Sequence, residues 1–161
     1  MKLAVLVLED EPGVRDALVR DLAPFADRVR VEAAEDVPDA WAVLDELEQD
    51  GDRLAVVLAD HRLPGTTGVD FLVEVHADAD TEEVRTVLVT GQADLEDTIR
   101  AVNRAGLHRY VAKPWDPDEL RGIVREQLTR FVIDARIDPL PHLAVLDAAQ
   151  VMEVLRGRGD R

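Results

Sequence analysis

Five polar side chains in this sequence could together perform metal and phosphoryl chemistry. Each directly follows an apolar run: the acids Glu9 and Asp10, the acid Asp60, the hydroxyl of Thr90 and the amine of Lys113. Carboxylates held close together repel one another unless a cation offsets their charge. Oxygen ligands without histidine or cysteine suit a hard divalent ion, and an incomplete shell that keeps waters suits Mg²⁺. These residue types therefore predict a magnesium site with a lysine and a hydroxyl beside it.

A carboxylate at such a site can act as a nucleophile toward a phosphoryl group, while the metal and the ammonium neutralise charge on the phosphoryl oxygens. Lys113 stands out because the chain has 17 arginines but only one other lysine, Lys2. A site that needs a compact ammonium would explain this use of lysine, although chance can also produce it. Taken alone, Asp60 is more often a turn or capping residue, so its meaning depends on what lies beside it.

The apolar runs that precede these residues predict strands that are buried on both faces. The expected strands, in chain order, are Lys2–Leu8, Arg28–Ala33, Leu54–Ala59, Val84–Val89 and Gly106–Ala112. Apolar residues at helical spacing follow each strand, so strand and helix alternate five times. This alternation is typical of an α/β fold with a doubly wound, five-stranded parallel sheet. Because parallel strands end at one edge of the sheet, the five polar side chains should converge there.

Helix starts can be predicted from residues that cap them. Asp36, Thr66 or Thr67, Asp94 and Asp116 each precede a helical pattern and can accept a hydrogen bond from its first turn. Pro12 fits the first position of the helix that follows Glu11, where proline is favoured.

Composition excludes several classes of function. The formal net charge is −15, which argues against direct binding to nucleic acid through this chain. The chain has no cysteine and no serine, so thiolate chemistry, disulfides and serine-nucleophile hydrolysis are excluded. The first apolar run is too short for a signal peptide or a membrane span. A soluble, cytoplasmic protein is the resulting expectation.

Four motifs together resemble the receiver domain of bacterial two-component response regulators. They are the acidic pair in LVLEDE, the aspartate in LADHRLPGTTG, the threonine in VLVTG and the Lys-Pro in RYVAKPW. The resemblance covers about residues 2–130, which we take as a receiver domain (1–130) with the flavodoxin-like fold. It implies that Asp60 accepts phosphate from a histidine kinase or a phosphotransfer protein. It also implies that Asp10, Glu9, Asp60 and the backbone carbonyl of Arg62 hold Mg²⁺.

In this family the lysine corresponding to Lys113 pairs with the acceptor carboxylate and then with the phosphoryl group, and its bond to Pro114 is cis. Thr90 and Tyr110 resemble the switch pair, in which the hydroxyl moves to the phosphoryl group and the ring rotates into the vacated space. The resemblance thus implies a signalling switch rather than an enzyme. It would act on an effector protein or through a homodimer, without contacting a membrane.

Residues 131–161 extend beyond a minimal receiver and predict a short helix. This C-terminal helical extension could pack on its own domain, pack on a second subunit, or be a linker to an output domain. Two other functions fit parts of this sequence. A degenerate receiver could act as a constitutive scaffold, and an aspartyl-phosphate phosphohydrolase has a similar architecture. The second is disfavoured because such enzymes need an aspartate where Arg62 stands.

Overall fold

The computed structural model describes residues 1–91, 96, 100, 103 and 106–159. The strands of its main sheet are β1 (Leu3–Leu8), β2 (Val29–Ala34), β3 (Arg53–Asp60), β6 (Arg85–Thr90) and β7 (Arg109–Ala112). The helices are α1 (Pro12–Asp21), α2 (Val37–Gln49), α3 (Gly68–Ala77), α5 (Pro117–Asp134) and α6 (Ala148–Gly159), with 3-10 turns η1 (Ala23–Phe25) and η3 (Leu140–Val145).

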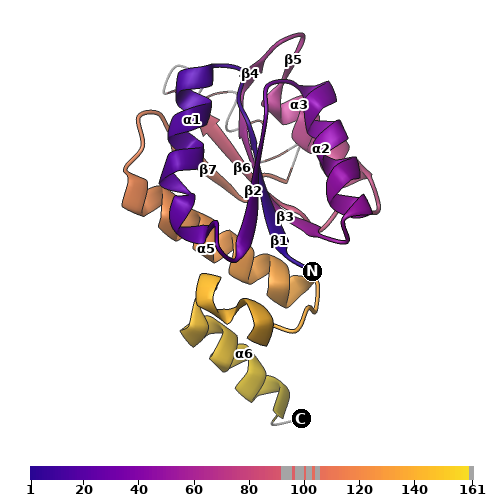
Figure 1. The fold of residues 1–161 in the computed structure, drawn as a ribbon, viewed down its shortest axis with the longest axis vertical. Coiled ribbons are helices and arrows are strands. Elements are labelled where there is room, and N and C mark those ends of the chain that lie inside the picture. The colour runs from indigo at the N-terminus through magenta and orange to yellow at the C-terminus, as the bar shows by residue number, and fades with distance from the viewer. Residues whose placement is uncertain (92–95, 97–99, 101–102, 104–105, 160–161) are drawn as a thin grey trace.

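The five strands form one parallel sheet in the order β2-β1-β3-β6-β7, with helices on both faces (Figure 1). The predicted doubly wound fold is therefore confirmed. A short antiparallel ribbon of β4 (Arg62–Leu63) and β5 (Thr66–Thr67) follows β3, and the turn between its strands contains Gly65 at a φ of 74°. This ribbon carries the chain away from the C-terminal edge of the sheet and into α3.

Two apolar cores lie on opposite faces of the sheet because successive side chains of a strand point to opposite sides. In β1, Leu3, Val5 and Val7 join a cluster with α1 and α5. The alternate residues of β1 (Ala4, Leu6 and Leu8) join a second cluster with α2 and α3. Both faces of the central strands are thus buried, which explains their continuous apolar runs.

Three of the predicted helix caps are present. The side chain of Asp36 accepts from the amide of Asp39 at 2.8 Å, that of Thr67 from Asp70 at 3.1 Å, and that of Asp116 from Asp118 at 2.9 Å. These contacts satisfy amide groups that a helix leaves without partners in its first turn. The helix expected after Asp94 lies outside the described residues, apart from the isolated positions 96, 100 and 103.

The start of the last strand was predicted wrongly. β7 begins at Arg109 rather than Gly106, because Gly106 has a φ of 63° and cannot continue an extended strand. His108 instead uses its imidazole Nδ1 to accept from the amide of Thr86 at 3.0 Å. The other strands begin and end within one or two residues of their predicted bounds.

The C-terminal extension packs on α5, at the end of the molecule away from the C-terminal edge of the sheet (Figure 1). α5 itself runs past residue 130 to Asp134. Val145, Leu146 and Val151 of the extension are buried in the same cluster as α5. Thr129 of α5 accepts from the amide of Asp147 at 2.8 Å. Packing in cis, one of the three alternatives, is therefore what the structure shows, while a domain boundary at residue 130 stays a prediction.

None of the described helices is both long enough and apolar enough to cross a membrane.

Candidate functional site

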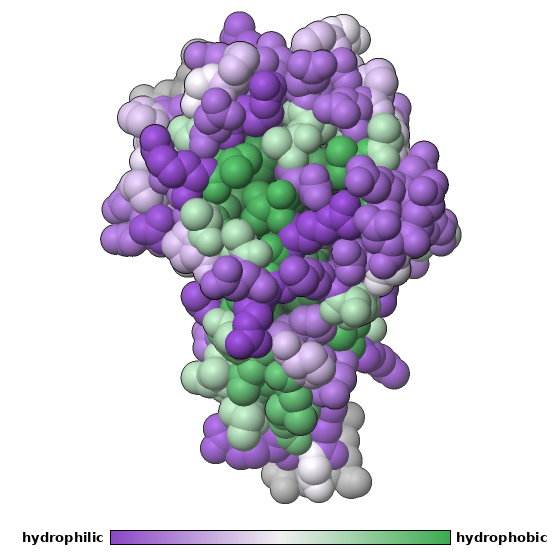
Figure 2. Space-filling view, viewed as in Figure 1, coloured by the Kyte–Doolittle hydropathy of each residue, from purple (hydrophilic) through white to green (hydrophobic). Residues whose placement is uncertain are grey.

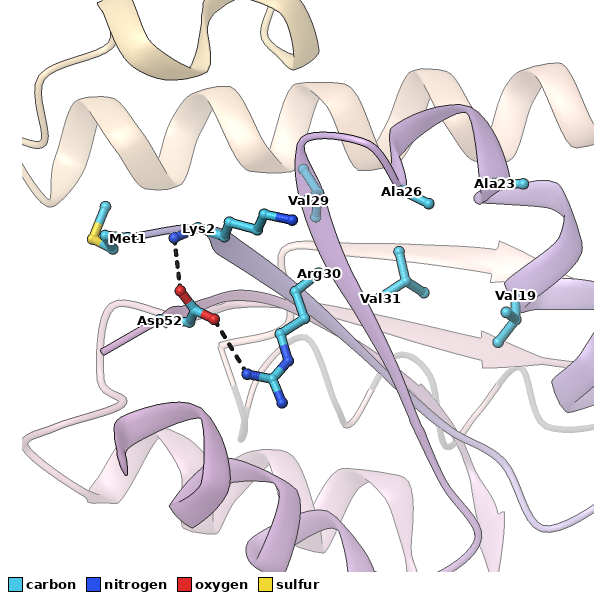
Figure 3. Close-up of a pocket in the computed structure, with 9 residues that line it drawn as sticks. All are labelled: Met1, Lys2, Val19, Ala23, Ala26, Val29, Arg30, Val31 and Asp52. Carbon is cyan, nitrogen blue, oxygen red and sulfur yellow. Dashed lines mark hydrogen bonds and ion pairs between the residues drawn. The ribbon is translucent and has the colours of Figure 1, made fainter. Parts of the chain in front are cut away.

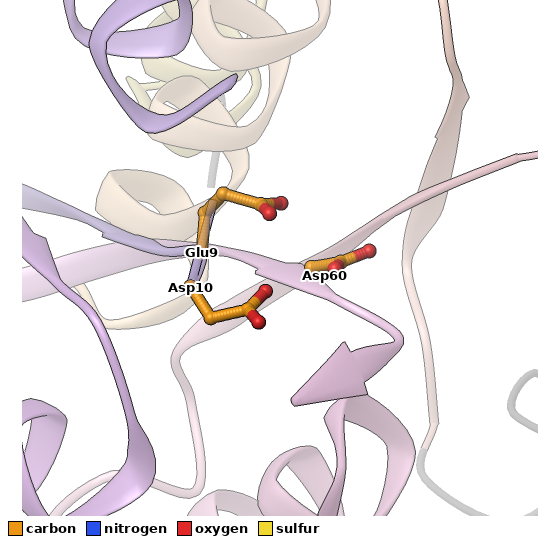
Figure 4. Close-up of side chains that lie close together, drawn as sticks. All are labelled: Glu9, Asp10 and Asp60. Atoms are coloured by element: carbon orange, nitrogen blue, oxygen red, sulfur yellow. The ribbon is translucent and has the colours of Figure 1, made fainter. Parts of the chain in front are cut away.

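Three carboxylates meet at the C-terminal edge of the sheet, as the parallel arrangement of the strands predicted. Glu9 and Asp10 follow β1, and Asp60 ends β3. One ligand oxygen from each lies within 4.8 Å of the others, and Figure 4 shows the three side chains gathered at this edge. Glu9 is 1% exposed and Asp60 is buried, whereas Asp10 is exposed to solvent. The cluster therefore has one side open to a ligand.

Lys113 lies between two of these carboxylates. Its Nζ donates to Oδ1 of Asp60 at 3.1 Å and to Oε2 of Glu9 at 3.2 Å. β7 positions this lysine, because the amide of Lys113 donates to the carbonyl of Thr90 at 2.9 Å at the end of β6. The Lys113–Pro114 peptide is cis, as the resemblance implied. The interior lysine singled out from the sequence is thus paired with the expected acceptor.

The charges of this cluster shift the pKa values of its members. Burial, with the neighbouring charge of Asp60, raises the pKa of the Glu9 carboxyl, and Lys113 offsets only part of that rise. Burial by itself would lower the pKa of the Lys113 ammonium. Hydrogen bonds to Asp60 and Glu9, and their charges, outweigh burial and raise that pKa. The ammonium therefore stays protonated at neutral pH, and its single charge is shared by the carboxylates of Asp60 and Glu9.

This arrangement fits a hard divalent cation. The donors are all carboxylate oxygens, their negative charge exceeds that of the single ammonium, and Asp10 is open to solvent. Mg²⁺ prefers such oxygen ligands and keeps several waters when it binds. Arg62 lies in β4, two residues after Asp60. The role expected for its backbone carbonyl as a further ligand stays a prediction.

Arg15 is a contributor to the site that sequence reasoning missed. Its Nη1 donates to the carbonyl of Glu9 at 3.0 Å, and the amide of Glu11 donates to Oε1 of Glu9 at 3.2 Å. The two contacts hold the backbone and the side chain of Glu9 from the start of α1. Almost all basic residues of this chain are arginines, so nothing in the sequence distinguishes Arg15 from the others.

Gly68 is the second contributor that was missed. Its amide donates to the carbonyl of His61 at 2.8 Å. A Cβ at this position would overlap the carbonyl oxygen of Asp60 and lie 2.9 Å from its carbonyl carbon and 3.1 Å from Cδ1 of Leu88. The first residue of α3 therefore packs directly against the backbone of Asp60, and only glycine fits there.

Thr90 and Tyr110 lie on the neighbouring strands β6 and β7. Thr90 is buried, and its hydroxyl donates to the carbonyl of Gly91 at 3.3 Å. Tyr110 pairs in register with Leu88, two residues before Thr90, and its side chain is 50% exposed. The hydroxyl and the ring thus occupy adjacent strands near the same edge, and their action as a switch stays a prediction.

With this site in view, the chain can be placed among known proteins. It matches the family described as the response regulator receiver domain over residues 5–125. The chain therefore belongs to the response regulator receiver family, whose general function is to be phosphorylated on an aspartate.

Individual relatives agree with this placement. The chain is 40% identical over 122 residues to the hydrogenase transcriptional regulatory protein HoxA of Cupriavidus necator, which covers 76% of this chain and 23% of that protein. It is 31% identical over 128 residues to the response regulator Rre1 of Synechocystis, covering 80% of this chain and 52% of that protein. The chain therefore spans 23% of the length of the first relative and 52% of the length of the second.

A solved structure shows the same fold. The signal receiver domain of an HD domain-containing protein from Pseudomonas fluorescens Pf-5 superimposes with a TM-score of 0.73 at 23% identity. The match covers 85% of this chain and 94% of that one.

Proposed function

We propose that this chain is a phosphorylation-dependent switch in which Asp60 accepts a phosphoryl group from a histidine kinase or a phosphotransfer protein. The observation that carries the proposal is the pairing of Lys113 with Asp60 inside the carboxylate cluster. A half-buried lysine and two further acids beside Asp60 are not expected around an ordinary turn aspartate.

The proposed transfer uses the residues of the cluster in distinct roles. An oxygen of Asp60 attacks phosphorus, a new P–O bond forms, and the P–N bond to the donor histidine breaks, with the histidine nitrogen keeping the electron pair. Lys113, already within hydrogen-bond distance of Asp60, offsets negative charge on the phosphoryl oxygens. Mg²⁺ held by Asp10, Glu9 and Asp60 would supply further positive charge at the same oxygens. The hydroxyl of Thr90 would then bind the acylphosphate and bias the position of Tyr110.

The chain would catalyse only its own phosphorylation and dephosphorylation, and its output would be a changed contact with an effector protein. A histidine kinase and Mg²⁺ are the partners that this proposal requires. The expected cytoplasmic location stays a prediction.

Intact-mass measurement tests the proposal. Incubation with Mg²⁺ and a small phosphodonor should add the mass of one phosphoryl group to the wild-type chain. Asp60→Asn should abolish the adduct, whereas Asp16→Asn, on the exposed face of α1, should leave it unchanged. An adduct that persists in Asp60→Asn, or a wild-type chain that takes up none, contradicts the proposal.

The same experiment separates the switch from a degenerate receiver that acts as a constitutive scaffold. A scaffold would bind no Mg²⁺ and form no adduct. Binding of Mg²⁺ can be followed by tryptophan fluorescence, because Trp115 lies two residues after Lys113 and its indole donates to Asp21 of α1 at 2.8 Å. A saturable change that Asp10→Asn removes would support the switch.

A further inference from the structure

An apolar groove runs along β2, the strand at one edge of the sheet. It has a volume of about 580 Å³, and its lining includes small apolar side chains of α1, η1 and β2. These residues are Val19, Ala23, Ala26, Val29 and Val31 (Figure 3). Figure 2 shows the same region as a hollowed hydrophobic patch on a mostly hydrophilic face. Such a patch on an edge strand is suited to a second protein surface.

The rim of this β2 groove is acidic. A single guanidinium, that of Arg30, pairs with four carboxylates: those of Glu32, Glu46, Asp50 and Asp52. Lys2 also lines the groove, but two positive charges cannot neutralise four acids, and the side chains of Glu46 and Asp50 are 63% and 50% exposed. The rim therefore has carboxylate oxygens available to a further basic group.

A second apolar patch lies on the C-terminal extension, on the same face of the molecule (Figure 2). Leu140 is 63% exposed and Met152 is 46% exposed. The end of α6 beside this patch is basic in a chain with a net charge of −15, since it carries Arg156 and Arg158. Within the described part of the chain, neither arginine forms an ion pair with a carboxylate. The extension thus offers apolar and basic groups to match the apolar floor and acidic rim of the β2 groove.

We propose that two copies of this chain form a two-fold dimer in which the α6 surface of each copy lies in the β2 groove of the other. Because both patches face the same side, a two-fold axis between them satisfies both contacts at once, as an isologous interface requires. Met152 would enter the apolar groove, and Arg156 would pair with Glu46 and Asp50 of the partner copy. This dimer does not depend on phosphorylation, so it stands apart from the proposed switch.

Sedimentation velocity of the full chain, over a range of concentrations and without Mg²⁺ or phosphodonor, tests the dimer. Wild type should approach twice the chain mass of 17.9 kDa as the concentration rises. Met152→Glu on α6 and Ala26→Glu in the groove place charge in the apolar contact. Each should weaken dimerisation at least about tenfold. Both positions are exposed in the single chain, so circular dichroism should show unchanged folding.

Charge reversal identifies the partner surfaces. Arg156→Glu and Glu46→Arg should each weaken the dimer, by roughly threefold to tenfold, through like-charge repulsion at the rim. The double variant should recover most of that loss, since the pair is restored with opposite signs. Arg130→Glu, an exposed position of α5 outside both patches, is the matched control and should have no effect.

Three results would overturn the dimer: a monomer at every concentration, a dimer insensitive to the Met152 and Ala26 variants, or a dimer that Arg130→Glu disrupts. The last would place the contact on α5. Because the phosphoryl adduct on Asp60 is measured independently, failure of the dimer and failure of the switch are distinguishable.

Discussion

Replacing Gly68 by alanine tests the close packing against the backbone of Asp60 and changes no charged group of the site. The new methyl group would overlap the carbonyl oxygen of Asp60 and lie 2.9 Å from its carbonyl carbon. Those atoms belong to the backbone of a buried central strand, which cannot move aside as a flexible side chain can. Overpacking of this kind costs about 1–3 kcal/mol, and the rigid neighbour places Gly68→Ala near 3 kcal/mol.

The loss can be measured by urea unfolding at 25 °C and by thermal unfolding. For a domain of this size, about 3 kcal/mol corresponds to a fall in Tm of about 6–12 °C. Gly122→Ala is the matched control, because a Cβ there meets nothing within 4 Å. That change, in the exposed middle of α5, should stabilise the chain by about 0.5–1 kcal/mol. If Gly68→Ala costs less than about 1 kcal/mol, the packing argument fails.

Three further outcomes follow from the structure. Mg²⁺ at a hundred times its Kd should stabilise the folded chain by about 2.7 kcal/mol, and Asp10→Asn should remove most of that gain in thermal unfolding. Burial, with the charges of Arg85 and His76, lowers the pKa of His108 to about 4. The unfolded chain takes up this proton near pH 6.5, so the free energy of unfolding should fall between pH 6.5 and 4, by up to about 3 kcal/mol. His108→Gln should flatten that slope in urea titrations at each pH, and an unchanged slope would show that other groups cause it. Thr129→Val removes the acceptor for the amide of Asp147 and should cost about 1–2 kcal/mol. Hydrogen exchange should then rise in residues 140–159 and not in β1, whereas uniform exchange would mean that the extension is not held by this contact.

Much of the fold was accessible from the sequence because each strand is buried on both faces. A continuous apolar run that ends at a polar residue indicates both the strand and its C-terminal end. The parallel arrangement then brought Asp10, Asp60 and Lys113 together without any contact being known. The start of β7 could not be predicted in this way. Leu107 extends the apolar pattern toward Gly106, whereas the positive φ of Gly106 and the bond between His108 and Thr86 keep these residues out of the strand.

Contacts made by unremarkable residue types were not predictable. Thr129 and Arg125 look like ordinary polar positions of a surface helix. In the structure the Arg125 guanidinium donates to the carbonyls of Ala144 and Leu146, each at 3.3 Å, and the Thr129 hydroxyl holds the start of α6. The same holds for Arg15 beside Glu9. These side chains bond to backbone groups, and every residue has such groups. The sequence pattern therefore does not indicate which residue is the partner.

α5 begins four residues after Lys113 and continues until it lies under the extension. Its 18 residues make a rod of roughly 27 Å at 1.5 Å per residue. A packed helix moves as a rigid unit. A small change of tilt at its first turn therefore displaces its last turn by a larger distance. α6 packs on α5 and would move with its C-terminal end. A rearrangement too small to alter the core could therefore still reposition the C-terminal end.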